Sequence, residues 1–68
     1  MAGKYENKLD YLSLRQGCLQ PMYVTKIKFS HYIVGVSYRG QSFISKEHQT
    51  HELAREDAAC QAYRFYKS

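Results

Sequence analysis

The chain has 68 residues and a formal net charge of +4, and 15% of its residues are aromatic. A chain of this length has room for one domain that buries about 60% of the surface of its unfolded form. We therefore expect a single domain over residues 1–68, with its core between about residues 5 and 66. This size leaves little room for a cleft with a complete catalytic apparatus, and the aromatic content argues against disorder.

The cysteine content and the hydropathy pattern indicate the cellular environment. Only Cys18 and Cys60 are present, and no apolar stretch has the length of a signal peptide or a membrane span. Small secreted domains usually contain more disulfides, so two cysteines favour reduced thiols. We expect an intracellular protein, cytoplasmic or nuclear, with no membrane partner.

The segment 5–16 has the period of an amphipathic helix. Tyr5, Leu9 and Leu12 recur at i, i+4 and i+7, which places them on one stripe. Gly17 follows this segment, and glycine is the residue most often found just past a helix end. The pattern predicts a helix over 5–16 that packs through this stripe.

The middle of the chain changes to β-branched and aromatic residues, which predict three strands at 23–28, 32–38 and 41–45. The connections between these strands are short, so we expect an antiparallel meander. In the second strand, alternate residues share one face. The predicted core face of this strand consists of Tyr32, Val34, Val36 and Tyr38.

The last part of the chain predicts a second helix that begins after Thr50, a favourable N-cap residue. The predicted buried stripe of this helix is mostly small and consists of Ala54, Ala58, Ala62 and Phe65. Small residues let a helix lie close to a sheet. The predicted fold class is α+β, in the order α-β-β-β-α, with two helices packed on one face of a three-stranded antiparallel sheet.

This order resembles the double-stranded-RNA-binding domain over about residues 9–63. The segment 17–23, Gly-Cys-Leu-Gln-Pro-Met-Tyr, is similar to the helix exit of that family, which ends in Pro-x-Tyr. Residues 32–43 fit its central hairpin without a gap. Small residues stand at the matching positions of the second helix: Ala54, Ala58, Ala59 and Ala62. The resemblance implies a non-catalytic RNA-binding module of an RNA-processing, RNA-silencing or RNA-editing protein.

In that family, helix 1, the loop between strands 1 and 2, and lysines at the start of helix 2 contact the RNA. Here the helix 1 Glu and Gln positions hold Tyr11 and Leu14, the loop lacks Gly-Pro-x-His, and the lysine pair is replaced by His51-Glu52. The last change removes about three charge units at neutral pH. The resemblance therefore implies double-stranded RNA as a weakly bound partner, recognised by shape and backbone.

Several cationic or imidazole side chains remain as candidate RNA contacts. Arg55 preserves the third basic position at the start of the second helix. The candidate RNA-binding residues are Arg55, Lys46, His51, His31 and Arg39.

Tyr11 and Leu14 are candidates for a different interaction. At 100° per residue they lie about 140–200° from Leu9, so we expect them to be exposed. They are either scattered surface apolar residues, which are common, or a surface for a protein partner or for self-association. The sequence leaves open weak RNA binding with or without dimerisation, and a pure protein-interaction domain without RNA binding.

The sequence does not support an enzyme, a metal site or a cofactor. His48 and His51 are close in sequence, but no Cys-x-x-Cys pair accompanies them, and a structural zinc site needs four ligands. The acidic residues show no nucleophile or base beside them. We expect no catalytic residues.

Overall fold

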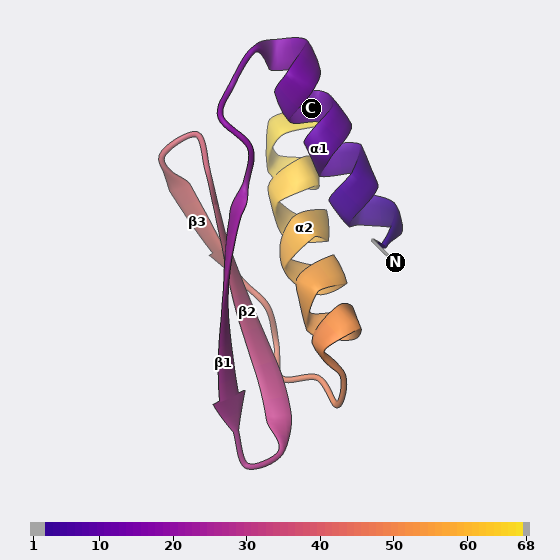
Figure 1. The fold of residues 1–68 in the computed structure, drawn as a ribbon, viewed down its shortest axis with the longest axis vertical. Helices are drawn as coiled ribbons and strands as arrows, with labels where there is room; N and C mark the ends of the chain where they lie inside the picture. Colours follow the sequence, from indigo (N-terminus) through magenta and orange to yellow (C-terminus); the bar gives the residue numbers. More distant parts are fainter. Residues whose placement is uncertain (1–2, 68) are drawn as a thin grey trace.

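The computed structural model describes residues 3–67. The elements follow the order α1 (Lys4–Gln16), β1 (Met22–Lys28), β2 (His31–Tyr38), β3 (Gln41–Ile44) and α2 (His51–Lys67). The strands form an antiparallel sheet in the order β1-β2-β3, and both helices lie on one side of it (Figure 1). The predicted fold class is confirmed. Within residues 3–67, no helix is long and apolar enough to cross a membrane.

Helix α1 ends where the sequence predicts, and Gly17 is the reason. Gly17 adopts a left-handed conformation with φ of 67°. Its amide donates to the carbonyl of Leu14, and the amide of Cys18 donates to the carbonyl of Ser13, which is the Schellman arrangement. Of the predicted stripe on this helix, Leu9 is fully buried, while Tyr5 and Leu12 are partly buried against the core.

The sheet separates an inner face from an open face. Val34, Val36 and Tyr38 are buried as predicted, and Tyr32 is partly buried at the end of the same row. The second strand begins one residue earlier than predicted, because His31 already pairs with Lys28, so only residues 29 and 30 connect the first two strands. The inner row of β2 is the centre of the core, since it faces α2 along its whole length.

Helix α2 begins as predicted but buries a different set of residues. The Thr50 hydroxyl accepts a hydrogen bond from the Leu53 amide at 3.2 Å, which confirms the N-cap. The prediction that Phe65 joins the buried stripe is wrong, because its side chain is 57% exposed. The fully buried residues of α2 are Ala54, Ala58, Ala59 and Ala62. Phe65 instead packs its ring at the surface against Phe43 and Tyr66.

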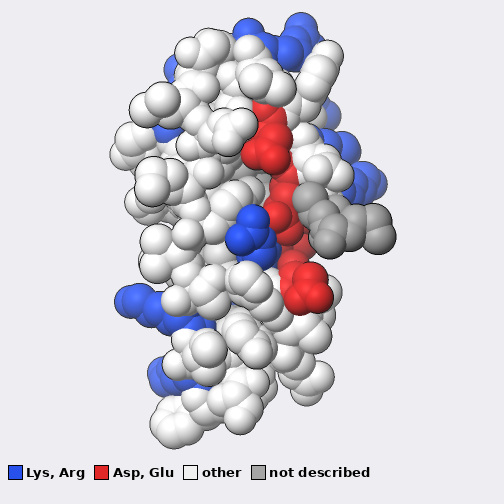
Figure 2. All heavy atoms as spheres, viewed as in Figure 1, with Lys and Arg blue, Asp and Glu red and all other residues white. Residues whose placement is uncertain are grey.

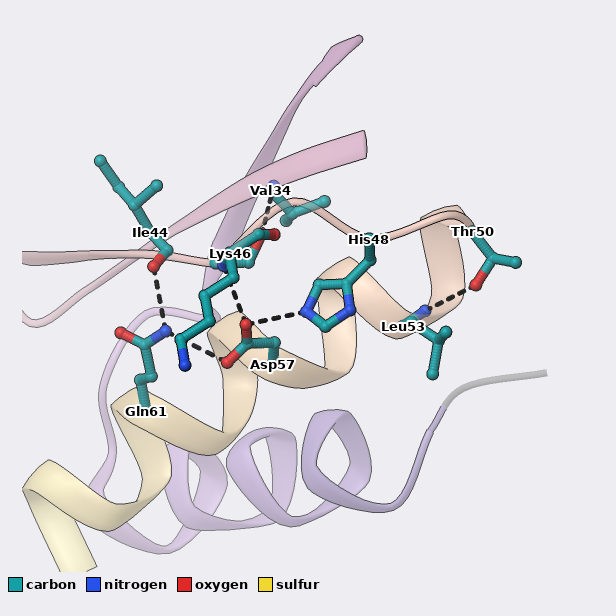
Figure 3. A network of polar contacts seen from close by, with 9 residues as sticks. Val34, Ile44, Lys46, His48, Thr50, Leu53, Asp57 and Gln61 are labelled. Atoms are coloured by element: carbon teal, nitrogen blue, oxygen red, sulfur yellow. Dashed lines mark hydrogen bonds and ion pairs between the residues drawn. The ribbon is translucent and has the colours of Figure 1, made fainter. Parts of the chain in front are cut away.

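The loop between β3 and α2 is fixed to α2 by Asp57 (Figure 3). The Asp57 carboxylate accepts hydrogen bonds from the Lys46 amide, His48 Nε2 and Gln61 Nε2 at 2.9, 2.9 and 3.2 Å. Burial alone would raise the pKa of the Asp57 carboxyl, but these hydrogen bonds hold that pKa below its ordinary value. The ionised carboxylate therefore stabilises the folded loop.

This lowered pKa predicts an acid-sensitive contribution to stability. Asp57 stabilises the fold above its unfolded pKa of about 4, and the contribution is lost as the pH falls through the lower folded value. Asp57→Asn should reduce the free energy of unfolding by about 1–3 kcal/mol at pH 6. The difference from the wild type should shrink below about pH 4. Urea denaturation at pH 6 and pH 3 measures both effects. Glu47→Gln, an exposed carboxyl in the same loop, is the control.

The turn between β1 and β2 is strained. Phe29 and Ser30 have φ values of 49° and 64°, and both are non-glycine residues. Two-residue hairpin turns with positive φ at both positions strongly favour Asn-Gly. The double substitution Phe29→Asn, Ser30→Gly should therefore raise the free energy of unfolding by about 1 kcal/mol. Ser42→Gly, at an exposed strand position, should instead be destabilising. A lower urea midpoint for the Asn-Gly variant would contradict this interpretation of the turn.

Candidate nucleic-acid and protein interface

The two helices are joined by reciprocal polar contacts. The Glu56 carboxylate of α2 accepts hydrogen bonds from the amides of Tyr5 and Glu6 at 2.6 and 3.2 Å. It thereby satisfies amides at the start of α1 and interacts favourably with the helix dipole. In return, Glu6 of α1 receives the Arg55 guanidinium of α2, with both Nε and a terminal nitrogen at 2.9 Å. We refer to Glu6, Arg55 and Glu56 as the helix junction.

Tyr23 on β1 lies beneath the helix junction. The Arg55 guanidinium lies 4.3 Å from the centroid of its ring. The Tyr23 hydroxyl is buried without a hydrogen-bond partner among the described residues. Burial raises the pKa of Tyr23 well above its ordinary value, and the negative charges of Glu6 and Asp10 raise it further. The surroundings of Tyr23 are therefore predominantly negative, despite the single positive charge of Arg55.

The charge distribution on this side of the molecule follows from the helix junction. Figure 2 shows acidic side chains gathered in a stripe over the helical part of the molecule, with one basic group against it and other basic groups towards the edges of the view. Glu6, Asp10 and Glu56 all raise the pKa of the Tyr23 hydroxyl through their negative charges. A phosphate backbone is repelled by such a stripe.

Four of the five candidate RNA-binding residues lie near one end of the molecule, and the fifth does not. The turn between β1 and β2 lies at the same end as the start of α2, while the turn between β2 and β3 lies at the other end (Figure 1). This arrangement brings His31, Lys46, His51 and Arg55 towards one end. Arg39 lies beyond the far end of β2, about 25 Å from His31 along the strand. The structure thus separates Arg39 from the other four candidates.

The contacts of the candidates differ in how much charge they leave available. The Lys46 side chain is exposed. Arg55 is paired with Glu6, and the Arg39 guanidinium contacts Gln16 Oε1 at 3.3 Å and lies 5.0 Å from the Tyr66 ring centroid. The two histidines bond within the domain: His51 Nε2 with the Thr25 hydroxyl at 2.8 Å, and His31 Nδ1 with the Phe29 carbonyl at 3.0 Å. Their roles in RNA binding stay predictions.

Tyr11 and Leu14 are exposed, as their positions on α1 predict. Their side chains are 63% and 70% exposed. Tyr11 is bordered by Arg15, whose guanidinium lies 5.8 Å from the ring centroid. The exposure is confirmed, and the binding role remains a prediction.

The structure also contains a basic surface that the sequence did not predict. Three lysines and an arginine surround the rings of Tyr5 and Tyr63, which lie 6.0 Å apart. Lys8 Nζ lies 5.1 and 5.6 Å from these two centroids, and the remaining cations lie 5.6–6.0 Å from one of them. We call this surface the basic helical face, and it consists of Lys4, Tyr5, Lys8, Tyr63, Arg64 and Lys67. Lys8 on α1 and Tyr63 on α2 are 55 positions apart in the sequence. Only the packing of the two helices brings these residues onto one surface.

The two histidines considered as metal ligands bond to different partners. His48 bonds to Asp57, whereas His51 bonds to Thr25 across to the sheet. No group of three or more His, Cys, Asp or Glu side chains with the geometry of a metal site is found within residues 3–67. Cys18 and Cys60 are both free thiols in the structure.

Comparison with solved structures identifies the fold. The chain matches the first double-stranded-RNA-binding domain of DRB4 with a TM-score of 0.87 and 23% identity, over 96% of this chain and 97% of that domain. It matches the second domain of DRB4 with a TM-score of 0.79 and 26% identity, over 97% and 99%. Against the DRB4 structure that holds both domains and their linker, the TM-score is 0.77, the identity is 26%, and 94% of this chain covers 44% of that one.

No protein-family model and no curated protein sequence matches the chain. The shared element order and the end-to-end match with both DRB4 domains show that the chain has the fold of the double-stranded-RNA-binding domain.

Proposed function

We propose that this domain binds double-stranded RNA weakly, through the phosphate backbone and without sequence preference. The observation that carries the proposal is the end-to-end structural match with two DRB4 domains that are named for this activity. The net charge of +4 and the exposed Lys46 also favour a polyanionic partner. Members of this fold recognise duplex RNA mainly by shape, which explains the lack of sequence preference.

The weakness of the proposed binding follows from the local charges. At the start of α2 the family's two lysines are replaced by His51 and Glu52. Arg55, at the third basic position, shares its charge with Glu6 at 2.9 Å. Each lost phosphate contact removes a counterion-release contribution that supports binding. The region therefore offers few uncompensated cations to a duplex.

We further propose that the domain is a non-catalytic module of a longer intracellular protein that acts in RNA processing, silencing or editing. The fold is that of a binding domain, and such domains occur in tandem in the DRB4 structure that holds two of them. Weak affinity in one module is compatible with this arrangement, because a linked second module raises the effective concentration of the first.

The proposed RNA binding predicts a steep dependence on salt. If about three phosphates are contacted, raising the salt from 50 to 200 mM should weaken the affinity about 40-fold. Titration of a 20-base-pair RNA duplex, followed by fluorescence anisotropy at both salt concentrations, measures this change. Two duplexes of unrelated sequence should bind with equal affinity. Tight binding that is insensitive to salt, or a strong preference between the duplexes, would contradict the proposal.

A second candidate function is protein binding through α1. Tyr11 and Leu14 project from α1 with more than half of each side chain exposed. Burial of each side chain could contribute roughly 1.5–3 kcal/mol before the cost of ordering. The proposed partner is a second copy of the domain or another protein. Such contact is compatible with RNA binding elsewhere on the molecule.

This second function predicts a change in self-association. The double substitution Tyr11→Glu, Leu14→Gln should weaken a dimer at least 10-fold, because it removes apolar burial and introduces a charge. Sedimentation velocity across a concentration series measures the dissociation constant. The control is Val24→Thr, Ile44→Thr, an exposed apolar pair on the open face of the sheet. A monomeric wild-type domain, or an equal effect of both pairs, would exclude dimerisation through α1.

A further inference from the structure

We propose that the phosphate backbone of double-stranded RNA binds at the basic helical face, on the opposite side of α1 from the acidic stripe. This inference rests on the proposed RNA-binding function and assigns that function to different residues. In the family, the start of α2 and the loop between strands 1 and 2 hold the RNA together with helix 1. Here four of the ten lysines and arginines lie on the N-terminal half of α1 and the C-terminal half of α2.

The first argument is the arrangement of charge around α1. Lys4, Lys8 and Arg15 fall within about 60° of one another on the helix, in line with Tyr11. Glu6 and Asp10 lie on the other side of the same helix and act on Tyr23. Helix α1 is therefore basic on one side and acidic on the other, and a polyanion can approach it favourably from the basic side alone.

The second argument is that these cations are uncompensated. The ion pairs among residues 3–67 are His48 with Asp57 and Arg55 with Glu6, so none of them involves a cation of the basic helical face. Lys4, Arg64 and Lys67 are exposed, and Lys8 is partly buried between the rings of Tyr5 and Tyr63. Four like charges gathered around two rings repel one another, and an incoming phosphate relieves that repulsion.

The third argument is the extent of the surface. Arg15 extends the basic side of α1 beyond the basic helical face: it lies 11 residues from Lys4, about 16 Å along the helix axis. A duplex carries about one phosphate charge per 1.7 Å of its axis, so a segment of this length presents more phosphates than the face has cations. Three of the four cations around Tyr5 and Tyr63 are lysines, which bind phosphate as point charges without demanding one geometry. Lysine side chains therefore suit binding to the phosphate backbone without recognition of the base sequence.

The test compares two charge reversals of equal size. Lys8→Glu, Arg64→Glu alters the basic helical face, and Lys28→Glu, Lys46→Glu alters the end of the molecule that corresponds to the family's RNA contacts. Both variants change the net charge by the same amount, so general electrostatic attraction falls equally. The affinity for a 20-base-pair RNA duplex is measured for each at 50, 100 and 200 mM salt.

We expect the Lys8 and Arg64 variant to bind at least 10-fold more weakly at 100 mM salt. The slope of log affinity against log salt should decrease by about two, corresponding to two lost phosphate contacts. The affinity of the Lys28→Glu, Lys46→Glu variant for the duplex should decrease less than threefold. Because Lys8 is partly buried against two tyrosine rings, the more exposed pair Lys4→Glu, Lys67→Glu is a second test of the same face and should also weaken binding at least 10-fold. Circular dichroism and urea midpoints check that each variant is folded.

The possible outcomes separate this inference from the proposed function. Duplex binding that is lost in the Lys28 and Lys46 variant alone, or lost equally in both, would overturn the inference and leave RNA binding intact. A wild-type domain that does not bind the duplex at 50 mM salt would overturn both. If poly-glutamate competes at the same charge concentration as the duplex, the face recognises acidic protein segments, and the assignment to RNA is wrong.

Discussion

The close packing of α2 between α1 and the sheet determines the arrangement of the remaining structure. Ala54, Ala58, Ala59 and Ala62 have no exposed surface, and their small side chains allow the helix to approach both neighbours. This approach brings Glu56 within hydrogen-bond distance of the first amides of α1 and Arg55 within reach of Glu6. A larger residue in the alanine row would separate the helices and leave these charged groups unpaired, which is costly when they are partly buried.

The helix junction also determines the electrostatics of the surface. Glu56 caps the N-terminus of α1, and Glu6 pairs with Arg55. Both carboxylates therefore lie near Tyr23. The polar contacts of the helix junction stabilise the fold, but they place carboxylates on the surface near Tyr23, where a phosphate would be repelled. Lys4, Lys8, Arg64 and Lys67, which form no ion pair with any described residue, gather on the other side of α1 around Tyr5 and Tyr63. The same packing thus produces both the acidic stripe and the basic helical face.

The fold allows its surfaces to diverge because few surface residues determine it. The core consists of the inner row of β2, Leu9 and the alanines of α2, and these residues lie away from the surface. Outside this core, large apolar side chains are unusually exposed, including Phe29 at 85% in a turn with positive φ. Exposed apolar groups in strained positions often indicate contact with a partner.

The sequence by itself determined the fold class, the helix and strand positions to within about one residue at most boundaries, the core row of β2 and the exposure of Tyr11 and Leu14. These features depend on local periodicity, on the conformational freedom of Gly17 and on the capping ability of Thr50, which are all properties of neighbouring residues. Only the tertiary structure decided that Phe65 lies at the surface, that Glu6 pairs with Arg55, and that Lys4 and Lys8 join Arg64 and Lys67. Contacts between residues about 50 positions apart depend on the relative rotation of two packed helices, and local periodicity does not determine that rotation.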